Sequence, residues 1–291
     1  MRLPDEFWTW RGHTIRYQRC GASGPPVVLV HGFGGNADHW VKNVRALADA
    51  GHRVFAIDLL GYGFADKPAP SANGGVNALY NFPNWGAQLL DFIDEVCGEP
   101  AYLIANSVGG VAALQAHADG ADRVRATCCL NISLRGLNER RNPAVVNAAV
   151  SQLQRLLRET PLGPFFFKQI AEPRALANVL KEAYADKAAV DDDLVDRILQ
   201  PGLQPGAAEV FLDFISYSTG PLPEDLLPKV DKERVMFGWG DKDPWENVKM
   251  GRELYEPMVR DFVELPGVGH CPMDEAPEQT NALMLRFLRE Y

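Results

Sequence analysis

Short apolar runs alternate with helix-like segments along the first part of the chain. The run VVLV at 27–30 is β-branched and has no polar position, which is typical of a strand buried on both faces. Residues 38–49 and 108–118 instead carry apolar positions at helical spacing. Strands that alternate with helices predict a mostly parallel sheet flanked by helices. The strands expected in this part are 14–19, 27–30, 53–59, 101–106 and 124–132.

The pattern changes after the fifth expected strand. Residues 133–225 contain no strand-like run and offer several amphipathic stretches separated by prolines. Strand patterns return at 234–240 and 261–267. We therefore predict one α/β core, residues 1–132 and 226–291, interrupted by a helical cap inserted at 133–225.

The sequence ANSVGG places one serine between a buried strand and a helix. A strand, a tight turn that holds Ser107 and a helix predict a nucleophile elbow, in which the hydroxyl stands above the sheet. The flanking positions must be small, as Ala105 and Gly109 are, although the usual pattern has glycine where Ala105 stands. The alternative is that Ser107 only caps the helix, since serine is a favoured N-cap.

A serine nucleophile needs a base, and the base needs an orienting acid. In this architecture the chain order is serine, acid, histidine. Asp243 follows the expected strand 234–240, and His270 lies in a glycine-flanked loop after the last strand. Open α/β sheets place their sites at the carboxyl ends of strands, so Ser107, Asp243 and His270 are the candidate catalytic residues. Asp241 is the rival acid.

An oxyanion formed during ester cleavage needs backbone N–H donors. One is the N–H that follows the serine, from Val108. The second is expected in the glycine-rich loop HGFGG, from Phe33, with Gly34 as its rival. We expect His31 of the same loop to hold the loop in shape and to take no part in proton transfer.

Five motifs follow one another along nearly the whole chain: HGFGGNADHW, DLLGYGFADKP, ANSVGG, GWGDKDPW and GVGHCPMDEAP. In these motifs the sequence resembles the α/β-hydrolase superfamily, which implies that fold and favours Asp243 as the acid. The last two, with NFPNWGAQLLDFI, are similar to a plant, algal and cyanobacterial branch of pheophytinases and chlorophyll dephytylases. That resemblance implies a chlorophyll-type phytyl ester as substrate and a plastid or cyanobacterial setting. Ala105 departs from the glycine usual in related sequences.

The expected function is hydrolysis of an apolar carboxylic ester through a Ser-His-Asp acyl-enzyme, with no metal and no organic cofactor. Leucines and phenylalanines of the predicted cap suit an apolar small-molecule substrate, and Gly34, Trp40, Leu134 and Trp245 are candidate substrate-binding residues. Two alternatives stay open: a receptor-like ligand-binding member with little turnover, and an acyl or thioester transferase. Epoxide hydrolases and haloalkane dehalogenases share this fold but have aspartate as the nucleophile, so Ser107 argues against both activities.

Charge and composition narrow the choice of partners. The net charge of −9 argues against nucleic acid and against anionic membrane surfaces, because both favour basic patches. No apolar run reaches about 18 residues, so no membrane span is expected. Five cysteines without a framework indicate free thiols in a reducing compartment, and no signal-peptide core is visible. We expect a soluble protein of the plastid stroma or the cytoplasm, of undetermined oligomeric state.

Overall fold

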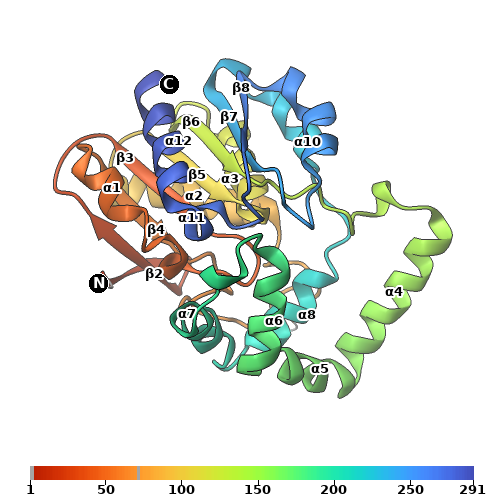
Figure 1. Ribbon diagram of the computed structural model, residues 1–291. Helices are drawn as coiled ribbons and strands as arrows, with labels where there is room; N and C mark the ends of the chain where they lie inside the picture. The colour runs from red at the N-terminus through yellow and green to blue at the C-terminus, as the bar shows by residue number, and fades with distance from the viewer. Residues whose placement is uncertain (1–2, 71–72) are drawn as a thin grey trace.

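One eight-stranded sheet runs through the computed structural model, which describes residues 3–70 and 73–291 (Figure 1). The strands are β1 (Asp5–Trp10), β2 (His13–Cys20), β3 (Pro26–Val30), β4 (Arg53–Ile57), β5 (Ala101–Asn106), β6 (Val124–Leu130), β7 (Val235–Gly240) and β8 (Asp261–Leu265). Their order in the sheet is β1-β2-β4-β3-β5-β6-β7-β8. The pairs β1–β2 and β2–β4 are antiparallel, and every pair from β4 to β8 is parallel. The predicted fold class is confirmed.

The first strand is one that the hydrophobic pattern did not predict. β1 pairs with β2 through a tight turn at Arg11 and Gly12, whose φ angles are +50° and +83°. A two-residue hairpin turn with two positive φ angles is usually signalled by Asn-Gly or Asp-Gly. Because arginine stands in the first position, the turn carries no such signal. Most residues of β1 are exposed or half-buried, so the strand forms no continuous apolar run in the sequence.

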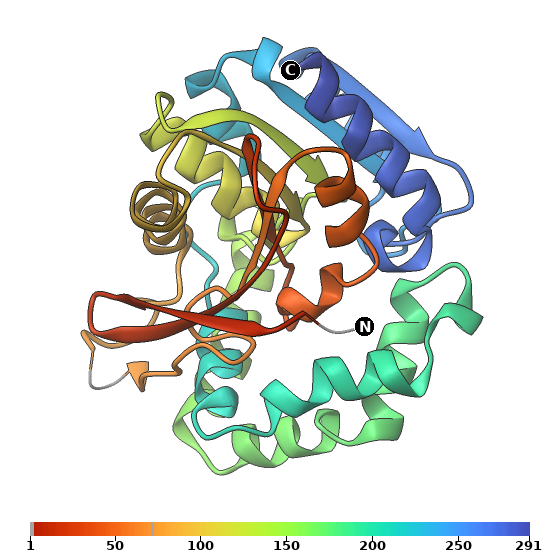
Figure 2. The ribbon, with the colours of Figure 1, turned by 90° about the vertical axis from the view of Figure 1, so that its left-hand side faces the viewer.

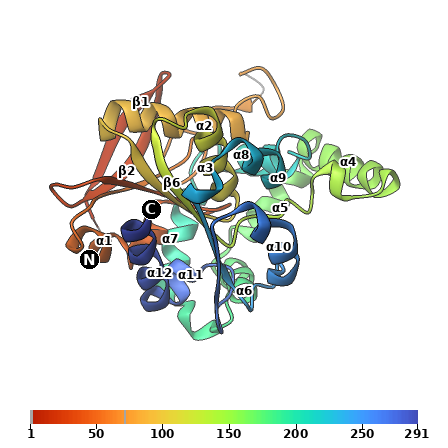
Figure 3. The same ribbon diagram turned by 90° about the horizontal axis from the view of Figure 1, so that it is seen from above.

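Helices cover both faces of the sheet (Figure 3). Residues of α2 (Phe82–Phe92) and α3 (Val108–Asp119) belong to one buried apolar cluster, with part of α10 (Val248–Tyr255). Residues of α1 (Val44–Asp49), α11 (Pro272–Glu275) and α12 (Pro277–Glu290) belong to the cluster on the other face. The inner strands are buried on both faces, which explains why they appear in the sequence as continuous apolar runs.

The chain between β6 and β7 is helical in the described residues and contains no strand. Its α-helices are α4 (Ala144–Glu159), α5 (Leu162–Ile170), α6 (Pro173–Ala183), α7 (Asp192–Gly202), α8 (Ala207–Ile215) and α9 (Pro223–Leu226). Helices α5 to α8 gather below the sheet in the view of Figure 1, and the green to cyan ribbon occupies the same side in Figure 2. The division of the chain into a core and a cap at residues 133 and 225 remains our prediction. Among the described helices, none has both the length and the apolar character needed to cross a membrane.

Candidate active site

Ser107 occupies a strained turn between β5 and α3. Its backbone has φ +55° and ψ −124°, and a positive φ is sterically costly for a residue with a Cβ. Ser107 stands at the N-cap position of α3, but its side chain makes no capping hydrogen bond. The hydroxyl is directed instead to a histidine, as the elbow interpretation of ANSVGG requires.

Small residues allow this turn to lie against the end of β3. A Cβ added at Gly109 would lie 2.3 Å from the carbonyl oxygen of His31, and one at Gly32 would lie 3.0 Å from the Cβ of Ser107. The atoms nearest to a Cβ at Gly109 all belong to the backbone of Val30 and His31. The turn is therefore confined mainly by the neighbouring strand.

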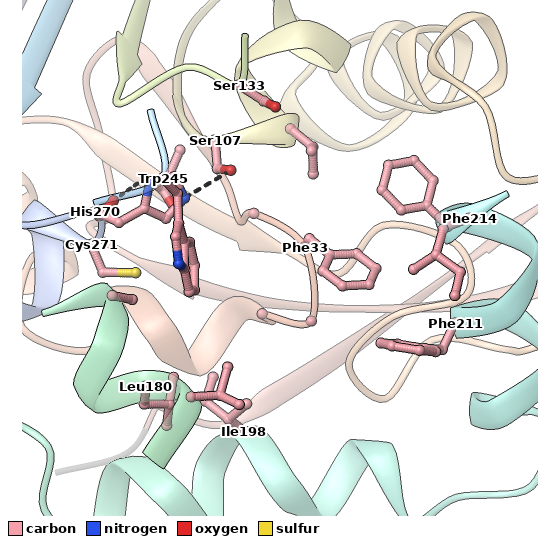
Figure 4. Close-up of a pocket in the computed structure, with 18 of the residues that line it drawn as sticks. Phe33, Ser107, Ser133, Leu180, Ile198, Phe211, Phe214, Trp245, His270 and Cys271 are labelled. Atoms are coloured by element: carbon pink, nitrogen blue, oxygen red, sulfur yellow. Dashed lines mark hydrogen bonds between the residues drawn. The ribbon is translucent and has the colours of Figure 1, made fainter. Parts of the chain in front are cut away.

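A chain of hydrogen bonds joins three of the predicted residues (Figure 4). The Oγ of Ser107 is 3.0 Å from Nε2 of His270, and Nδ1 of His270 is 2.8 Å from Oδ2 of Asp243. With the Nδ1 proton donated to the carboxylate, Nε2 is the nitrogen that can accept the serine proton. The rival acid, Asp241, accepts from the backbone N–H of Gly267 and makes no contact of this kind with His270.

The carboxylate of Asp243 is surrounded by donors. Its Oδ1 accepts from the backbone N–H groups of Trp245 (2.9 Å) and Glu246 (3.0 Å). Burial alone would raise the pKa of Asp243, but the hydrogen bond and charge of His270, with these donors, outweigh it and hold that pKa below its usual value. Asp243 is therefore ionised at neutral pH and can stabilise an imidazolium.

Asn131 is a site residue that the sequence analysis missed. It follows β6, adopts φ +46°, and donates from Nδ2 to Oδ2 of Asp243 at 2.7 Å. The same amide donates to the carbonyl of Gly269 at 3.2 Å and accepts from the N–H of Gly240. Asn131 thus ties together the loops that carry Asp243 and His270. An asparagine after a strand carries no signal of this role without knowledge of its neighbours.

Glu246 is a second residue that the sequence did not reveal. It lines the cavity beside Ser107 and accepts from Oγ of Ser133 at 2.8 Å and from the N–H of Leu134 at 3.0 Å. Burial raises its pKa, although these two donors oppose the effect. Glu246 therefore fixes the segment that leaves β6 against the segment that leaves β7.

The glycine-rich loop is held by His31, as expected. Leu59 donates its N–H to Nε2 of His31 at 3.0 Å, and Nδ1 of His31 lies 2.8 Å from the carbonyl oxygen of Gly32. Burial lowers the pKa of His31, so the ring is neutral and serves as a bridge between two backbone segments.

A buried cluster of charged side chains lies next to the glycine-rich loop and stabilises the segments around it. Arg16 is fully buried and pairs with Asp58 at 2.8 Å and with Asp38 at 2.9 Å. Asp58 also accepts from the N–H of Ala37 at 2.7 Å. The cluster connects β2, the end of β4 and the segment that follows the glycine-rich loop, and it gives Asp58 a structural role.

The two residues that carry the candidate oxyanion donors line the cavity. Phe33 and Val108 both line it, and neither backbone N–H donates a hydrogen bond within residues 3–70 and 73–291. Gly34 also lines the cavity and has φ +70°. These groups are therefore placed where a developing negative charge could use them, and their assignment as an oxyanion hole stays a prediction.

A cavity of about 530 Å³ opens over Ser107. This volume is within the range of small-molecule sites. Phe33 packs against Phe211 and Phe214, with ring centroids 5.4 Å apart in both pairs (Figure 4). Other apolar walls come from α5, α6 and α7: Phe167, Ile170, Leu176, Val179, Leu180, Ile198 and Leu199. The cavity therefore suits an apolar ligand.

The structure brings only some of the predicted substrate-binding residues to this cavity. Gly34 and Trp245 line it, and the Trp245 ring lies 4.9 Å from that of His270, measured between centroids. Trp40 does not: a short 3-10 turn directs it into the apolar cluster against the sheet, where it is fully buried. Leu134 is also absent from the wall, and its side chain packs in the apolar cluster on the other face of the sheet. The described residues contain no group of three or more His, Cys, Asp or Glu that could hold a metal ion.

Comparisons with known proteins agree with this architecture. The chain is 27% identical to the chloroplastic pheophytinase of Arabidopsis thaliana over 327 aligned residues, which cover 99% of this chain and 67% of the relative. It is 26% identical to epoxide hydrolase A of Mycobacterium tuberculosis, over 95% of this chain and 94% of the relative. The crystal structure of an alpha/beta hydrolase fold protein from Burkholderia ambifaria superposes with a TM-score of 0.76 at 23% identity, covering 97% of each chain, and this likeness bears on the fold alone. The model of the alpha/beta hydrolase family matches residues 27–283, and the chain belongs to that family.

Proposed function

We propose that the protein is a serine hydrolase that cleaves an apolar carboxylic ester through an acyl-enzyme. The observation that carries the proposal is the hydrogen-bonded chain from Asp243 through His270 to Ser107, at the wall of an apolar cavity. A serine hydroxyl within reach of an oriented imidazole is the arrangement that nucleophilic catalysis needs.

The reaction would run in two steps. Ser107 Oγ attacks the acyl carbon while its proton passes to Nε2 of His270, and Asp243 stabilises the imidazolium. The N–H groups of Phe33 and Val108 bind the oxyanion, and each such donor is typically worth about 10²–10³ in rate. His270 then protonates the leaving alkoxide. Water, deprotonated by His270, attacks the acyl-enzyme and releases the acid, and the proton returns to Ser107.

The substrate class follows from the walls of the cavity. Aliphatic and phenylalanine side chains dominate them, so binding would draw on apolar burial and not on ion pairing. The similarity to a pheophytinase supports a chlorophyll-type phytyl ester as the first substrate to test, and a chloroplast as a setting to consider. The similarity to an epoxide hydrolase does not lead us to propose epoxide opening. Epoxide hydrolases of this fold are expected to carry an aspartate nucleophile at the elbow, where this chain has Ser107.

Turnover of matched serine variants tests the proposal. Ser107→Ala and Ser133→Ala remove hydroxyls from the same cavity, but only Ser107 contacts His270. On p-nitrophenyl esters of increasing chain length, we expect Ser107→Ala to lose at least about 10⁴ in kcat and Ser133→Ala to lose far less. Equal turnover by wild type and Ser107→Ala would refute it. Adding alcohols or thiols and analysing the products separates hydrolysis from acyl transfer.

A further inference from the structure

Helices α4 and α5 form an arm, residues 143–170, at the edge of the molecule. Figures 1 and 3 both show α4 projecting away from the sheet. Among residues 143–170, all of which the structure describes, only Gln154 and Gly163 are buried. The arm packs on the rest of the protein mainly through α8.

One face of α4 is apolar and has no partner in the described structure. At about 100° per residue, Val145, Leu153 and Leu156 fall within one third of the helix circumference. Val145 is 77% exposed and Leu153 56% exposed. The opposite face, which includes the buried Gln154, is the one that packs. α4 therefore carries more apolar surface than its contacts use.

The same feature continues on α5. Leu162, Phe165 and Phe166 are exposed, with Phe165 at 63%. Isolated exposed apolar residues are common, but contiguous groups on a monomer indicate an interaction surface. We call this group the arm patch, and it consists of Val145, Leu153, Leu156, Leu162, Phe165 and Phe166.

The arm patch adjoins the cavity. Phe167 and Ile170, on α5 beside Phe165 and Phe166, line the cavity, and so does Leu137, which precedes α4 and is exposed. An apolar molecule on the arm patch would therefore meet an apolar path to the wall of the cavity.

The charge of the arm differs from that of the whole chain. Residues 143–170 contain Arg155, Arg158 and Lys168 but only one acid, Glu159, so the arm carries a net charge of +2 where the whole chain carries −9. Arg155 pairs with Glu159 at 2.8 Å and the Nε of Arg158 is buried, so Lys168 is the exposed basic residue of the arm that the described structure leaves without an ion pair. Exposed Phe and Leu side chains with a neighbouring basic residue are typical of helices that lie in the interface of an anionic bilayer. The acidic overall charge had argued against such a surface, and the arm is a local exception.

We propose that the arm patch docks on the surface of an anionic lipid bilayer, and that an apolar substrate dissolved there reaches the cavity along α5. The route of the substrate rests on the proposed function, whereas docking itself does not require turnover. Binding would combine burial of the Leu, Val and Phe side chains with attraction of the basic residues to the headgroups.

Vesicle flotation tests the docking. The full chain carrying Ser107→Ala is mixed with phosphatidylcholine vesicles that contain about 30% phosphatidylglycerol. Leu153→Asp with Phe165→Asp places charge on the arm patch, and Phe7→Asp is the matched control, because Phe7 is 61% exposed on β1, outside the arm. We expect the arm variant to lower the partition coefficient by about tenfold or more and Phe7→Asp to leave it unchanged. Circular dichroism confirms that each variant is folded.

The outcomes separate docking from catalysis. Absence of vesicle binding, or binding that the arm substitutions do not weaken, overturns the proposal. A dimer would also overturn the proposal if light scattering detects it at high protein concentration and the double variant Leu153→Asp with Phe165→Asp abolishes it. A second copy of the chain would then cover the arm patch. Turnover of a short water-soluble ester by otherwise wild-type protein is measured in parallel, and the arm substitutions should leave it unchanged. A failure of the proposed function would appear there as absent turnover, whatever the vesicles show.

Discussion

Asn131 donates a hydrogen bond of 2.7 Å from Nδ2 to Oδ2 of Asp243, the same oxygen that accepts the hydrogen bond from Nδ1 of His270. The asparagine therefore fixes the direction of the carboxylate and, through it, the plane of the imidazole. It also reaches the backbone beside His270, at Gly269. On the proposed function Asn131 is a positioning residue, since it acts on the reaction only through Asp243 and His270.

Removing the Asn131 amide should slow turnover without weakening substrate binding. We expect Asn131→Gly and Asn131→Ala to lower kcat by about tenfold to about a hundredfold with KM little changed, because a misplaced base loses rate. Glycine tolerates the φ of +46°, so the glycine variant should be the more stable of the two by about 1 kcal/mol. Full kcat in the glycine variant would show that the hydrogen bond has no positioning role.

Asp243 and Glu246 should contribute to stability with opposite dependence on pH. The pKa of Asp243 is lowered in the folded state, so its contribution is present above its unfolded pKa of about 3.9 and is lost as the pH falls through the folded value. The pKa of Glu246 is raised, so its contribution is present below the unfolded pKa of about 4.3 and is lost as the pH rises through the folded value.

Urea unfolding of two amide variants from about pH 3 to about pH 7 measures this difference. Relative to wild type, Asp243→Asn should lose stability as the pH rises through this range, and Glu246→Gln should gain it. Parallel pH curves for the two variants would contradict the assigned directions.

The buried Arg16 should matter far more to stability than an exposed arginine on the same strand. Arg16→Met removes the guanidinium that pairs with the buried carboxylates of Asp58 and Asp38, and such a loss costs about 3–5 kcal/mol in the free energy of unfolding. Arg19→Met breaks only the exposed pair with Glu6, which is worth about 0–1 kcal/mol. Equal losses in urea unfolding would show that the buried cluster does not support the fold.

Filling the cavity should change the preference of the enzyme for the chain length of its ester substrates. Ile198 of α7 lines the cavity, so Ile198→Trp would shorten the space available to an acyl or alkyl chain. We expect kcat/KM for long-chain esters to fall by about tenfold while short-chain esters are little affected. Leu203→Trp, at an exposed position just after α7, is the control. A uniform loss over all chain lengths would indicate that Ile198 does not lie on the path of the substrate.

The sheet and the hydrogen-bonded chain could be predicted because their signals are local. A continuous apolar run marks a buried strand, and Ser107 and Asp243 follow such strands, β5 and β7. His270 lies in the loop beyond β8, which is shorter and only partly buried. Parallel strands bring their carboxyl ends to one edge, so three separate segments meet without knowledge of side-chain contacts.

Asn131 and Glu246 could not be found in this way. Their partners come from the pairing of β6 with β7, which are separated by the whole helical segment, and their residue types are common in loops. Trp40, in contrast, was predicted for the cavity and lies elsewhere. The sequence analysis names it as a candidate substrate-binding residue, but a 3-10 turn stands at the start of the expected helix and directs the ring into the core.

The most direct test of the proposed function is covalent labelling of the nucleophile. Purified protein is treated with a fluorophosphonate probe, and the adduct is located by mass spectrometry in wild type and in His270→Ala. Because Ser107 depends on His270 as its base, we predict one adduct, on Ser107, that is absent from the folded His270→Ala variant. An unlabelled, folded wild-type protein, or labelling of Ser107 that does not depend on His270, would contradict the account.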